Sequence, residues 1–261
     1  MNHHPITVFD SGLGGLTVLR ALRGRLPRED FFYFADTRFL PYGDRSEVFL
    51  KERGVLIAEA LARRGAKALV IACNTATAAA AEAIRAATAL PVVALEPGVK
   101  PAAALTKSGV IGVLATTRTL ESERFQRLVG NHANHLRVVG QACPGLADAI
   151  ESEGADGPAV AALLDRFVAP LAAAGADVVV LGCTHYPWVA EAIARRMPDG
   201  VMLLDNGEAV ARQLERLLAA GGLLGGGHGH LTLATSGAPA AVSVTVDRLF
   251  GAKMHVEHWE P

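Results

Sequence analysis

Residues 65–75 of the chain read GAKALVIACNT, and residues 175–185 read GADVVVLGCTH. Both stretches begin with Gly-Ala, continue as an apolar run and reach a cysteine at the same offset, Cys73 in the first and Cys183 in the second. Continuous apolar runs are typical of parallel strands that are buried on both faces of a sheet. The repeat therefore predicts two related halves, each with a thiol at the end of a strand.

Other short apolar runs alternate with longer, Ala-rich amphipathic segments along the chain. A repeated order of strand and helix favours an α/β fold with mostly parallel central sheets. The predicted strands cover residues 6–10, 31–35, 68–73, 91–96, 109–115, 177–183, 201–205 and 231–236. The predicted helices include residues 16–26, 47–65, 74–87, 159–175 and 188–197.

Two interruptions of this pattern, at EPGVKP (96–101) and near Asp205–Gly207, predict the domain boundaries. We expect an N-terminal α/β domain of residues 1–97 plus 208–261, whose sheet is completed by the C-terminal tail. A second, pseudo-symmetric α/β domain covers residues 98–207. The glycine-rich stretch 221–230 is interpreted as a flexible connection within the tail. Because ligands of such sheets bind outside the C-terminal strand ends, we expect the active site in the cleft between the domains.

The composition argues against several classes of protein. The 261 residues carry a formal net charge of −1 with interspersed signs, so we expect no nucleic-acid partner. The 3 cysteines do not form a disulfide framework. We expect neither a signal peptide at MNHHPITVFDSG nor a membrane partner, since no apolar run approaches the roughly 20 residues that span a bilayer. These features favour a cytoplasmic protein with free thiols.

Each repeated cysteine is expected between a strand end and a helix start, where backbone N–H groups and the helix dipole favour anions. A thiol in such a position can serve as a base or nucleophile. An isolated cysteine at a strand end is usually a small buried hydrophobe, and Cys143, which has no counterpart, is interpreted in this way. Residues that could hold a carboxylate follow the other two thiols: Asn74 and Thr75 after Cys73, and Thr184 and His185 after Cys183.

The turn DSGLGG, residues 10–15, has the form of an anion-binding loop at a helix N-terminus. Asp36 ends the second predicted strand, about where a ribose-binding acid would fall, so a nucleotide-binding oxidoreductase stays an alternative. Thr17, however, replaces the third glycine of the dinucleotide fingerprint. Asp10 also has an interpretation as an Asx turn or N-cap.

Two further patterns have weaker support. The turn Pro41-Tyr42-Gly43 can offer a backbone amide and a hydroxyl to a ligand. A zinc site formed by Cys73, Cys183 and His185 is conceivable, but the usual ligand spacings are absent.

A pair of thiols suits inversion at a carbon that carries a hydrogen. One thiolate removes the α-hydrogen of a small carboxylate from one face, and a thiol on the other face supplies a new hydrogen. Two opposed bases avoid the need for one base to swing past the carbon. Two facing cysteines could instead form a disulfide, but such a pair could not act as acid and base.

Several motifs occur together between residues 9 and 208: FDSGLGGLTVLRAL, FADTRFLPYGDRS, ACNTATA, EPGVKPA, LGCTHYP and LDNGE. In this combination the chain resembles the glutamate racemases of the aspartate/glutamate racemase superfamily. The resemblance implies interconversion of L- and D-glutamate without pyridoxal phosphate, metal or any other cofactor. It also implies supply of D-glutamate for peptidoglycan synthesis, and a homodimer. Racemisation of aspartate or of another amino acid, and non-catalytic binding of a carboxylate, stay open as alternatives.

The resemblance also implies roles for individual residues. Cys73 takes the proton from D-glutamate with help from Asp10, and Cys183 takes it from L-glutamate with help from His185. Glu151 matches an acidic position of the family near the second thiol. The expected substrate-binding residues are Asp10, Ser11, Pro41, Tyr42, Gly43, Cys73, Asn74, Thr75, Thr116, Thr119, Cys183, Thr184 and His185.

Overall fold

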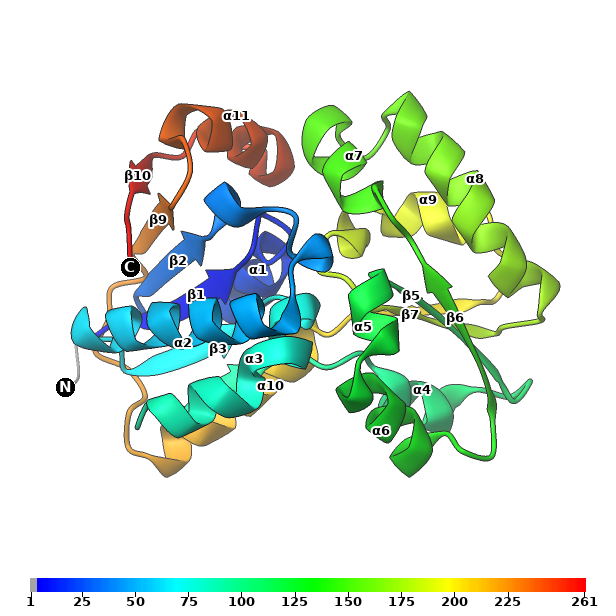
Figure 1. Ribbon diagram of the computed structural model, residues 1–261, viewed down its shortest axis with the longest axis horizontal. Coiled ribbons are helices and arrows are strands. Elements are labelled where there is room, and N and C mark those ends of the chain that lie inside the picture. The colour runs from blue at the N-terminus through cyan, green and yellow to red at the C-terminus, as the bar shows by residue number, and fades with distance from the viewer. Residues whose placement is uncertain (1–3) are drawn as a thin grey trace. The chain divides into compact units, whose positions relative to one another are not determined.

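The computed structural model describes residues 4–261, which form two compact units (Figure 1). Unit 1 contains the described residues up to Leu95 together with Gly207–Pro261, and unit 2 contains Glu96–Asn206. Every strand pair in both units is parallel, and helices connect the strands, so the predicted α/β fold class is confirmed. The expected domain boundaries, after residues 97 and 207, stay a prediction.

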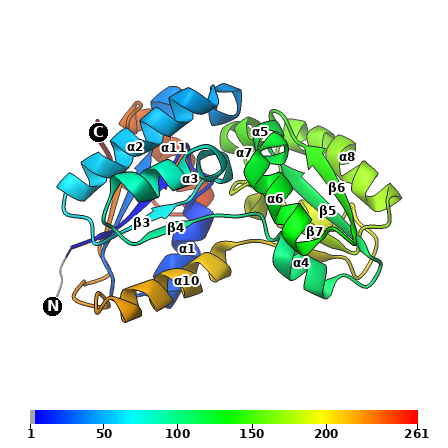
Figure 2. The same ribbon diagram turned by 60° about the horizontal axis from the view of Figure 1, so that its bottom comes forward.

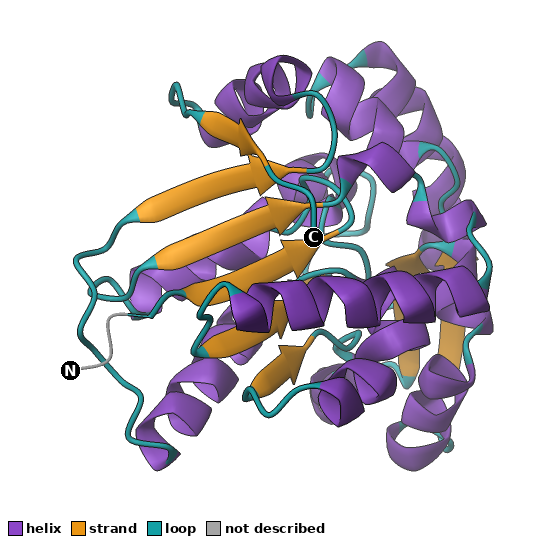
Figure 3. Ribbon diagram, turned by 60° about the vertical axis from the view of Figure 1, so that its left-hand side comes forward, coloured by secondary structure: helices purple, strands orange, loops and turns teal. Residues whose placement is uncertain are grey.

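Unit 1 has a six-stranded sheet in the order β10-β9-β2-β1-β3-β4, whose strands point the same way (Figure 3). β9 pairs with β2, so the C-terminal tail joins the sheet that the N-terminal strands begin. Its elements are β1 (Ile6–Asp10), α1 (Leu16–Arg25), β2 (Phe31–Ala35), η1 (Thr37–Phe39), η2 (Tyr42–Asp44), α2 (Glu47–Arg63), β3 (Ala68–Ile71), α3 (Asn74–Ala87), β4 (Val92–Ala94), α10 (Gly207–Ala220), β9 (Leu231–Thr235), α11 (Pro239–Phe250) and β10 (Val256–His258).

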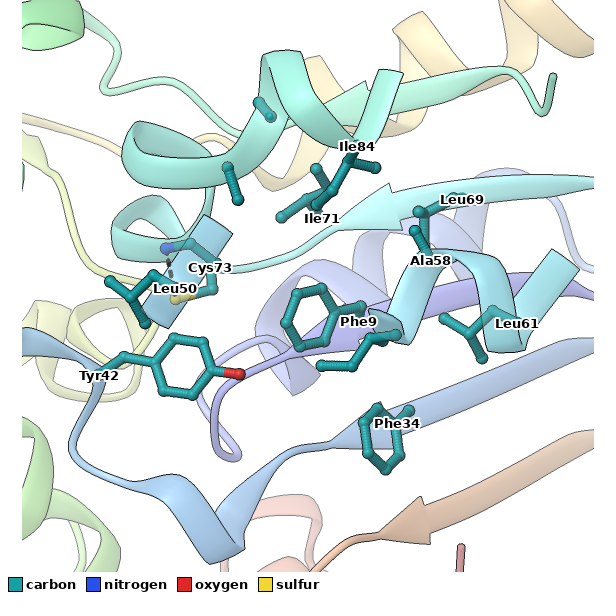
Figure 4. Packing of buried hydrophobic residues seen from close by; sticks show 14 of the residues in the cluster. Phe9, Phe34, Tyr42, Leu50, Ala58, Leu61, Leu69, Ile71, Cys73 and Ile84 are labelled. Carbon is teal, nitrogen blue, oxygen red and sulfur yellow. Dashed lines mark hydrogen bonds between the residues drawn. The ribbon is translucent and has the colours of Figure 1, made fainter. Parts of the chain in front are cut away.

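The pleat of this sheet directs alternate side chains to opposite faces. Phe9, Phe34 and Ile71 belong to a buried cluster with residues of α2 and α3 (Figure 4). These two helices approach closely at Gly54. A Cβ added there would lie 2.9 Å from the Cβ of Ala80. α1 and α10 lie side by side away from α2 and α3 (Figure 2). The sheet is therefore covered by helices on both faces, which explains its nearly continuous apolar strands.

Unit 2 has a four-stranded sheet in the order β6-β5-β7-β8. Val113 and Val180 of its central strands form a buried cluster with Val99 and Phe125 of the covering helices. Its elements are α4 (Val99–Leu105), β5 (Val110–Ala115), α5 (Thr117–Glu121), α6 (Glu123–His132), β6 (Arg137–Ala142), α7 (Leu146–Glu153), α8 (Pro158–Ala173), β7 (Val178–Leu181), η3 (Tyr186–Val189), α9 (Ala190–Ala194) and β8 (Met202–Leu204).

The two sheets share one arrangement of four strands. The order β2-β1-β3-β4 in unit 1 has the same form as β6-β5-β7-β8 in unit 2, and the repeated phrases lie at β3 and β7. Ala72 donates its N–H to the Phe9 carbonyl at 2.7 Å, and Gly182 donates to the Leu114 carbonyl at the same distance. Each repeated cysteine therefore leaves its sheet next to the strand at which the chain order reverses, where α/β proteins bind ligands.

Three details differ from the sequence prediction. The expected helix 188–197 is a 3₁₀ turn, Tyr186–Val189, followed by the short helix Ala190–Ala194. β6 and β10 were not expected, because neither stretch has a long apolar run.

No helix within residues 4–261 combines the length and apolar character that a bilayer-spanning segment needs.

The glycine-rich stretch 221–230, expected to be flexible, is held by a buried ion pair. The Nζ of Lys67 lies 2.5 Å from a carboxylate oxygen of Glu29, and both side chains are almost fully buried. Lys67 also donates to the carbonyls of Leu223 at 2.9 Å and Gly225 at 3.1 Å, and the N–H of Gly225 donates to Glu29 at 2.6 Å. These bonds hold the connection against the rest of unit 1, ahead of β9.

Candidate active site

Cys73 lies at the carboxyl end of β3 and is the N-cap of α3. Its Sγ accepts the backbone N–H of Ala76 at 3.4 Å and lies 3.3 Å from the hydroxyl of Ser11. In Figure 4 the same thiol lies at one end of the hydrophobic cluster, together with Leu50 and Tyr42. The positive end of a helix dipole and a hydroxyl donor favour a thiolate at this position.

Asp10, at the end of β1, is fully buried and is held by the glycine turn that follows it. Its Oδ1 accepts the N–H of Ser11 at 2.7 Å, and its Oδ2 accepts the N–H of Gly15 at 2.6 Å. A Cβ at Gly15 would lie 2.9 Å from that same Oδ2, so a side chain there would displace the carboxylate. The expected anion-binding loop therefore already holds an anion, which belongs to the chain itself.

Asp36, the acidic residue on which the nucleotide-binding alternative depends, is bound by other side chains of the chain. Asp36 is fully buried and accepts two hydrogen bonds from Arg53, at 2.9 and 2.7 Å, and one from the Tyr42 hydroxyl at 2.6 Å. These bonds occupy both oxygens that a ribose would need.

Residues 4–261 contain no group of three His, Cys, Asp or Glu side chains that could hold a metal ion.

The Tyr42 hydroxyl is committed to Asp36 instead of standing free for a ligand. Burial first, and then the negative charge and hydrogen bond of Asp36, raise the pKa of Tyr42 well above its usual value. The neighbours differ in exposure, since Pro41 is exposed and Gly43 is half-buried. Within the expected turn, the tyrosine ring packs in the core, and its two neighbours are the residues that reach solvent.

Asn74 provides the clearest sign of a ligand position in unit 1. It is the first residue of α3 and is 5% exposed, yet neither its side-chain oxygen nor its nitrogen has a hydrogen-bond partner among the described residues. A buried amide without partners costs about 1–3 kcal/mol. Thr75, the next residue, is 4% exposed. The amide therefore fits a polar ligand group bound beside the Cys73 thiol.

Cys183 has a different set of partners at the end of β7. Its Sγ lies 3.6 Å from Nδ1 of His185, and Nε2 of His185 lies 2.6 Å from a carboxylate oxygen of Glu151 on α7. Burial opposes protonation of the imidazole, but hydrogen bonds and charges of Cys183 and Glu151 outweigh it and raise the pKa of His185 well above its usual value. A protonated His185 donates from both nitrogens, one to the sulfur and one to the carboxylate.

Most of the chain matches a known family. The sequence profile of the Asp/Glu/hydantoin racemases matches residues 33–214. The chain belongs to this family. A glutamate racemase of Ectopseudomonas mendocina is 54% identical over 215 residues, which cover 82% of this racemase-family chain and 82% of that one. The family membership inferred from the motifs is confirmed.

Solved structures agree over almost the whole chain. A glutamate racemase isoform of Bacillus anthracis has a TM-score of 0.89 and 31% identity, covering 100% of this chain and 98% of that one. The glutamate racemase of Escherichia coli, in complex with L-glutamate and the activator UDP-MurNAc-ala, has a TM-score of 0.86 and 31% identity, covering 98% of both chains. The fold of this racemase-family chain is therefore that of glutamate racemases.

Three threonines of the racemase-family chain lie near the second thiol in the sheet. Thr184 directly follows Cys183 and is buried. Thr116 directly follows β5, the neighbour of β7, and caps α5 by accepting the N–H of Thr119 at 3.2 Å. The hydroxyls of Thr116 and Thr119 are 2.9 Å apart. Both side chains therefore have a structural role at the start of α5, whatever they contribute to a substrate.

Sequence reasoning missed three tyrosine contacts. Tyr33 donates to Asp10, Tyr42 donates to Asp36, and the fully buried Tyr186 adjoins the thiols of Cys183 and Cys143. Burial raises the pKa of Cys143 to about 12. Cys143 is therefore a thiol at neutral pH. A signal for Tyr33 existed in the sequence, since its hydroxyl interrupts the aromatic run FFYFA.

Proposed function

We propose that the protein is a glutamate racemase that interconverts L- and D-glutamate with two cysteines and no cofactor. One observation carries the proposal: two buried thiols follow equivalent strands of two equivalent sheets, and each has its own polar partners. Ser11 and the Asp10 loop adjoin Cys73, and the His185–Glu151 pair adjoins Cys183. The identity to glutamate racemases supports glutamate as the substrate.

In the proposed reaction the two thiols act on opposite faces of one α-carbon. The Cys73 thiolate takes the α-proton of D-glutamate, and the electrons of the C–H bond stay on the α-carbon. That carbon then takes a proton from the Cys183 thiol, which yields L-glutamate and a Cys183 thiolate. The reverse direction begins from this last state, so the protein exchanges a proton between its thiols through solvent before it repeats the same direction.

The partners of each thiol suit this exchange. His185 lies against Cys183, and the α3 dipole and Ser11 lie against Cys73, so each thiol has its own polar group beside it. The Asn74 amide, which has no partner among the described residues, is suited to a carboxylate or ammonium group of the substrate. We assign the remaining substrate contacts to Thr75, Thr184 and the backbone around Ser11 and Gly43.

The decisive experiment is incubation with L-glutamate in deuterated water without added cofactor. We expect loss of optical rotation and one deuterium at the α-carbon of the D-glutamate that forms. In a two-base mechanism the L-glutamate recovered early in the reaction stays free of deuterium, because the thiol that removes its α-hydrogen can return only that same hydrogen, and deuterium enters from the other face. Deuterium that enters recovered L-glutamate as fast as product forms contradicts two separate bases.

The same assay separates the competing functions. L-Aspartate is the comparison substrate, since the family includes racemases of both amino acids. If kcat/KM is higher for aspartate than for glutamate, aspartate becomes the proposed substrate. Binding of glutamate without any exchange would support a carboxylate-binding protein.

We further propose that the D-glutamate serves peptidoglycan synthesis and that the enzyme acts in the cytoplasm as a homodimer. The E. coli relative, whose activator is a nucleotide of muramic acid, supports the link to the cell wall. A bacterium that has this enzyme as its sole source of D-glutamate will need external D-glutamate once the gene is removed. Growth without D-glutamate, in a strain shown to have no other source, contradicts this role. Sedimentation of the purified protein tests the dimer.

A further inference from the structure

We infer that Tyr33 is a positioning residue for the Cys73 half of the reaction, acting through Asp10. The inference rests on the proposed function, because it concerns the thiol that removes a proton from D-glutamate. It starts from the contacts of a buried hydroxyl that neither the repeat nor the family motifs identified.

The sheet brings Tyr33 to Asp10. β1 and β2 are parallel neighbours in which Val8 is paired with Tyr33 and Asp10 with Ala35. Because side chains alternate along a strand, Tyr33 and Asp10 project from the same face of the sheet. Tyr33 is 1% exposed, so its hydroxyl is removed from water.

The hydroxyl of Tyr33 contacts the start and the middle of the glycine turn. It lies 2.9 Å from Oδ2 of Asp10 and 2.9 Å from the carbonyl oxygen of Gly12. The N–H of Gly15 reaches the same Oδ2 from the far end of the turn, at 2.6 Å. Tyr33 and Gly15 thus hold one oxygen of the carboxylate in place from two sides.

The other oxygen of Asp10 leads to the thiol. Oδ1 accepts the N–H of Ser11 at 2.7 Å, and the Ser11 hydroxyl lies 3.3 Å from Sγ of Cys73. Without the Tyr33 hydroxyl, the carboxylate of Asp10 is free to rotate. Such a rotation would move Oδ1 away from Ser11. Tyr33 therefore fixes the orientation of Asp10 and, with it, the position of the hydroxyl beside the thiol.

The test is Tyr33→Phe, which removes one oxygen and keeps the ring. We expect kcat/KM to fall about tenfold to a hundredfold, because Oδ2 of Asp10 loses one of the two groups that hold it. The fall must be equal in both directions, because the equilibrium constant between mirror images is one. The rate alone therefore cannot show which thiol is affected.

Isotope effects show which thiol is affected. If the Cys73 step becomes slower, the effect of α-deuterium on kcat/KM rises for D-glutamate, whose C–D bond Cys73 breaks. It falls for L-glutamate, whose C–D bond Cys183 breaks in a step that then limits the rate less. Unchanged isotope effects, or a shift in the opposite sense, overturn the inference.

Two controls separate positioning from stability. Phe34→Leu changes the next residue of β2, whose ring packs in the cluster with α2 and α3, and should lower the midpoint of thermal unfolding without changing the isotope effects. In an Asp10→Asn background, Tyr33→Phe should have less than a twofold further effect on kcat/KM. A full additional loss there means that Tyr33 does not act through Asp10. Lack of racemisation by the unmodified protein would instead defeat the proposed function.

Discussion

At the scale of single residues, the two thiols differ in the groups that surround them. Cys73 has a hydroxyl and a helix N-terminus, whereas Cys183 has an imidazole that is itself bound to a carboxylate. The partners of Cys73 are neutral dipoles, whereas the imidazole beside Cys183 has a raised pKa and can carry a full positive charge. Equivalent positions in two related sheets therefore carry different chemistry.

Replacement of either thiol tests the proposed division of labour. We expect Cys73→Ser and Cys183→Ser each to lower racemisation by about a thousandfold or more, since a hydroxyl is a far weaker acid and general acid–base catalysis contributes about 10²–10⁴. Cys143→Ala is the control and should stay within about threefold of the unmodified rate. Full activity in either of the first two variants contradicts the two-thiol scheme.

The space around Gly15 gives a second prediction. In Gly15→Ala the new Cβ would meet Asp10 and Ala72 at 2.9 Å, so the carboxylate must move. Such overpacking costs about 1–3 kcal/mol, and we expect kcat/KM to fall about tenfold to a hundredfold. Gly24→Ala, in α1 with no atom within 4 Å of the new Cβ, should raise stability by about 0.5–1 kcal/mol and leave the rate unchanged. Equal rates for both variants would contradict the role of this contact.

The residues that the sequence identified are those whose signal is local. Cys73, Asp10 and His185 stand at strand ends within short polar phrases, and this position shows in the chain itself. Tyr33 and Arg53 gained their roles from partners that are distant along the chain, brought near by strand register or helix packing. No local pattern identifies such a partner, so these contacts required the structure.

At the scale of secondary-structure elements, the predictable strands are those with a continuous apolar run. β3 and β7 are apolar along their whole length because helices cover both faces of the sheet. β6 is only half-buried, and β10 has 3 residues at the edge of its sheet, so neither needs a long apolar run. β6 and β10 therefore escaped sequence-based prediction, whereas β4 and β8, which also lie at sheet edges, have apolar runs and were predicted.

The contact between α7 and the turn after β7 predicts a pH dependence of stability. Because the pKa of His185 is raised in the folded state, its contribution is fully present below the unfolded value of about 6.5. The contribution disappears as the pH rises through the folded-state pKa. We expect the difference in unfolding free energy between the unmodified protein and His185→Asn to be constant between about pH 5 and 6.5 and to shrink above that range.

Urea titrations at several pH values provide this measurement. Glu151→Gln is a useful companion variant, because it removes the carboxylate charge that faces Nε2 of His185. In this background the effect of His185→Asn on the unfolding free energy should be smaller. A difference that grows with rising pH would mean that His185 is neutral in the folded protein.

At the scale of the whole molecule, unit 1 is made from two separate parts of the chain. Its C-terminal part enters through the connection 221–230, which the buried pair of Lys67 and Glu29 holds in place. Sequence analysis assigned the tail to this half from its strand pattern. The docking of the connection was not predictable, because glycine-rich sequence by itself indicates only freedom of the backbone.

Removal of one member of this pair should destabilise the fold strongly. Lys67→Met leaves Glu29 buried without its counter-charge, and we expect a loss of about 3–5 kcal/mol in the unfolding free energy. The double variant Lys67→Met/Glu29→Met removes both charges and should recover much of this loss. Chemical denaturation of the three proteins measures the effect. A loss below about 1 kcal/mol in the single variant would mean that water reaches Glu29.

The place of β9 in the first sheet also sets the order in which a ribosome-bound chain can become structured. Strands β1 to β4 leave the ribosome early, but the partner of β2 follows only after all of unit 2 has been made. At about 5–20 residues per second, translation of the intervening chain takes roughly 10–30 s. During that time one edge of the nascent sheet has no neighbour. The half that is synthesised first is therefore the half that is finished last.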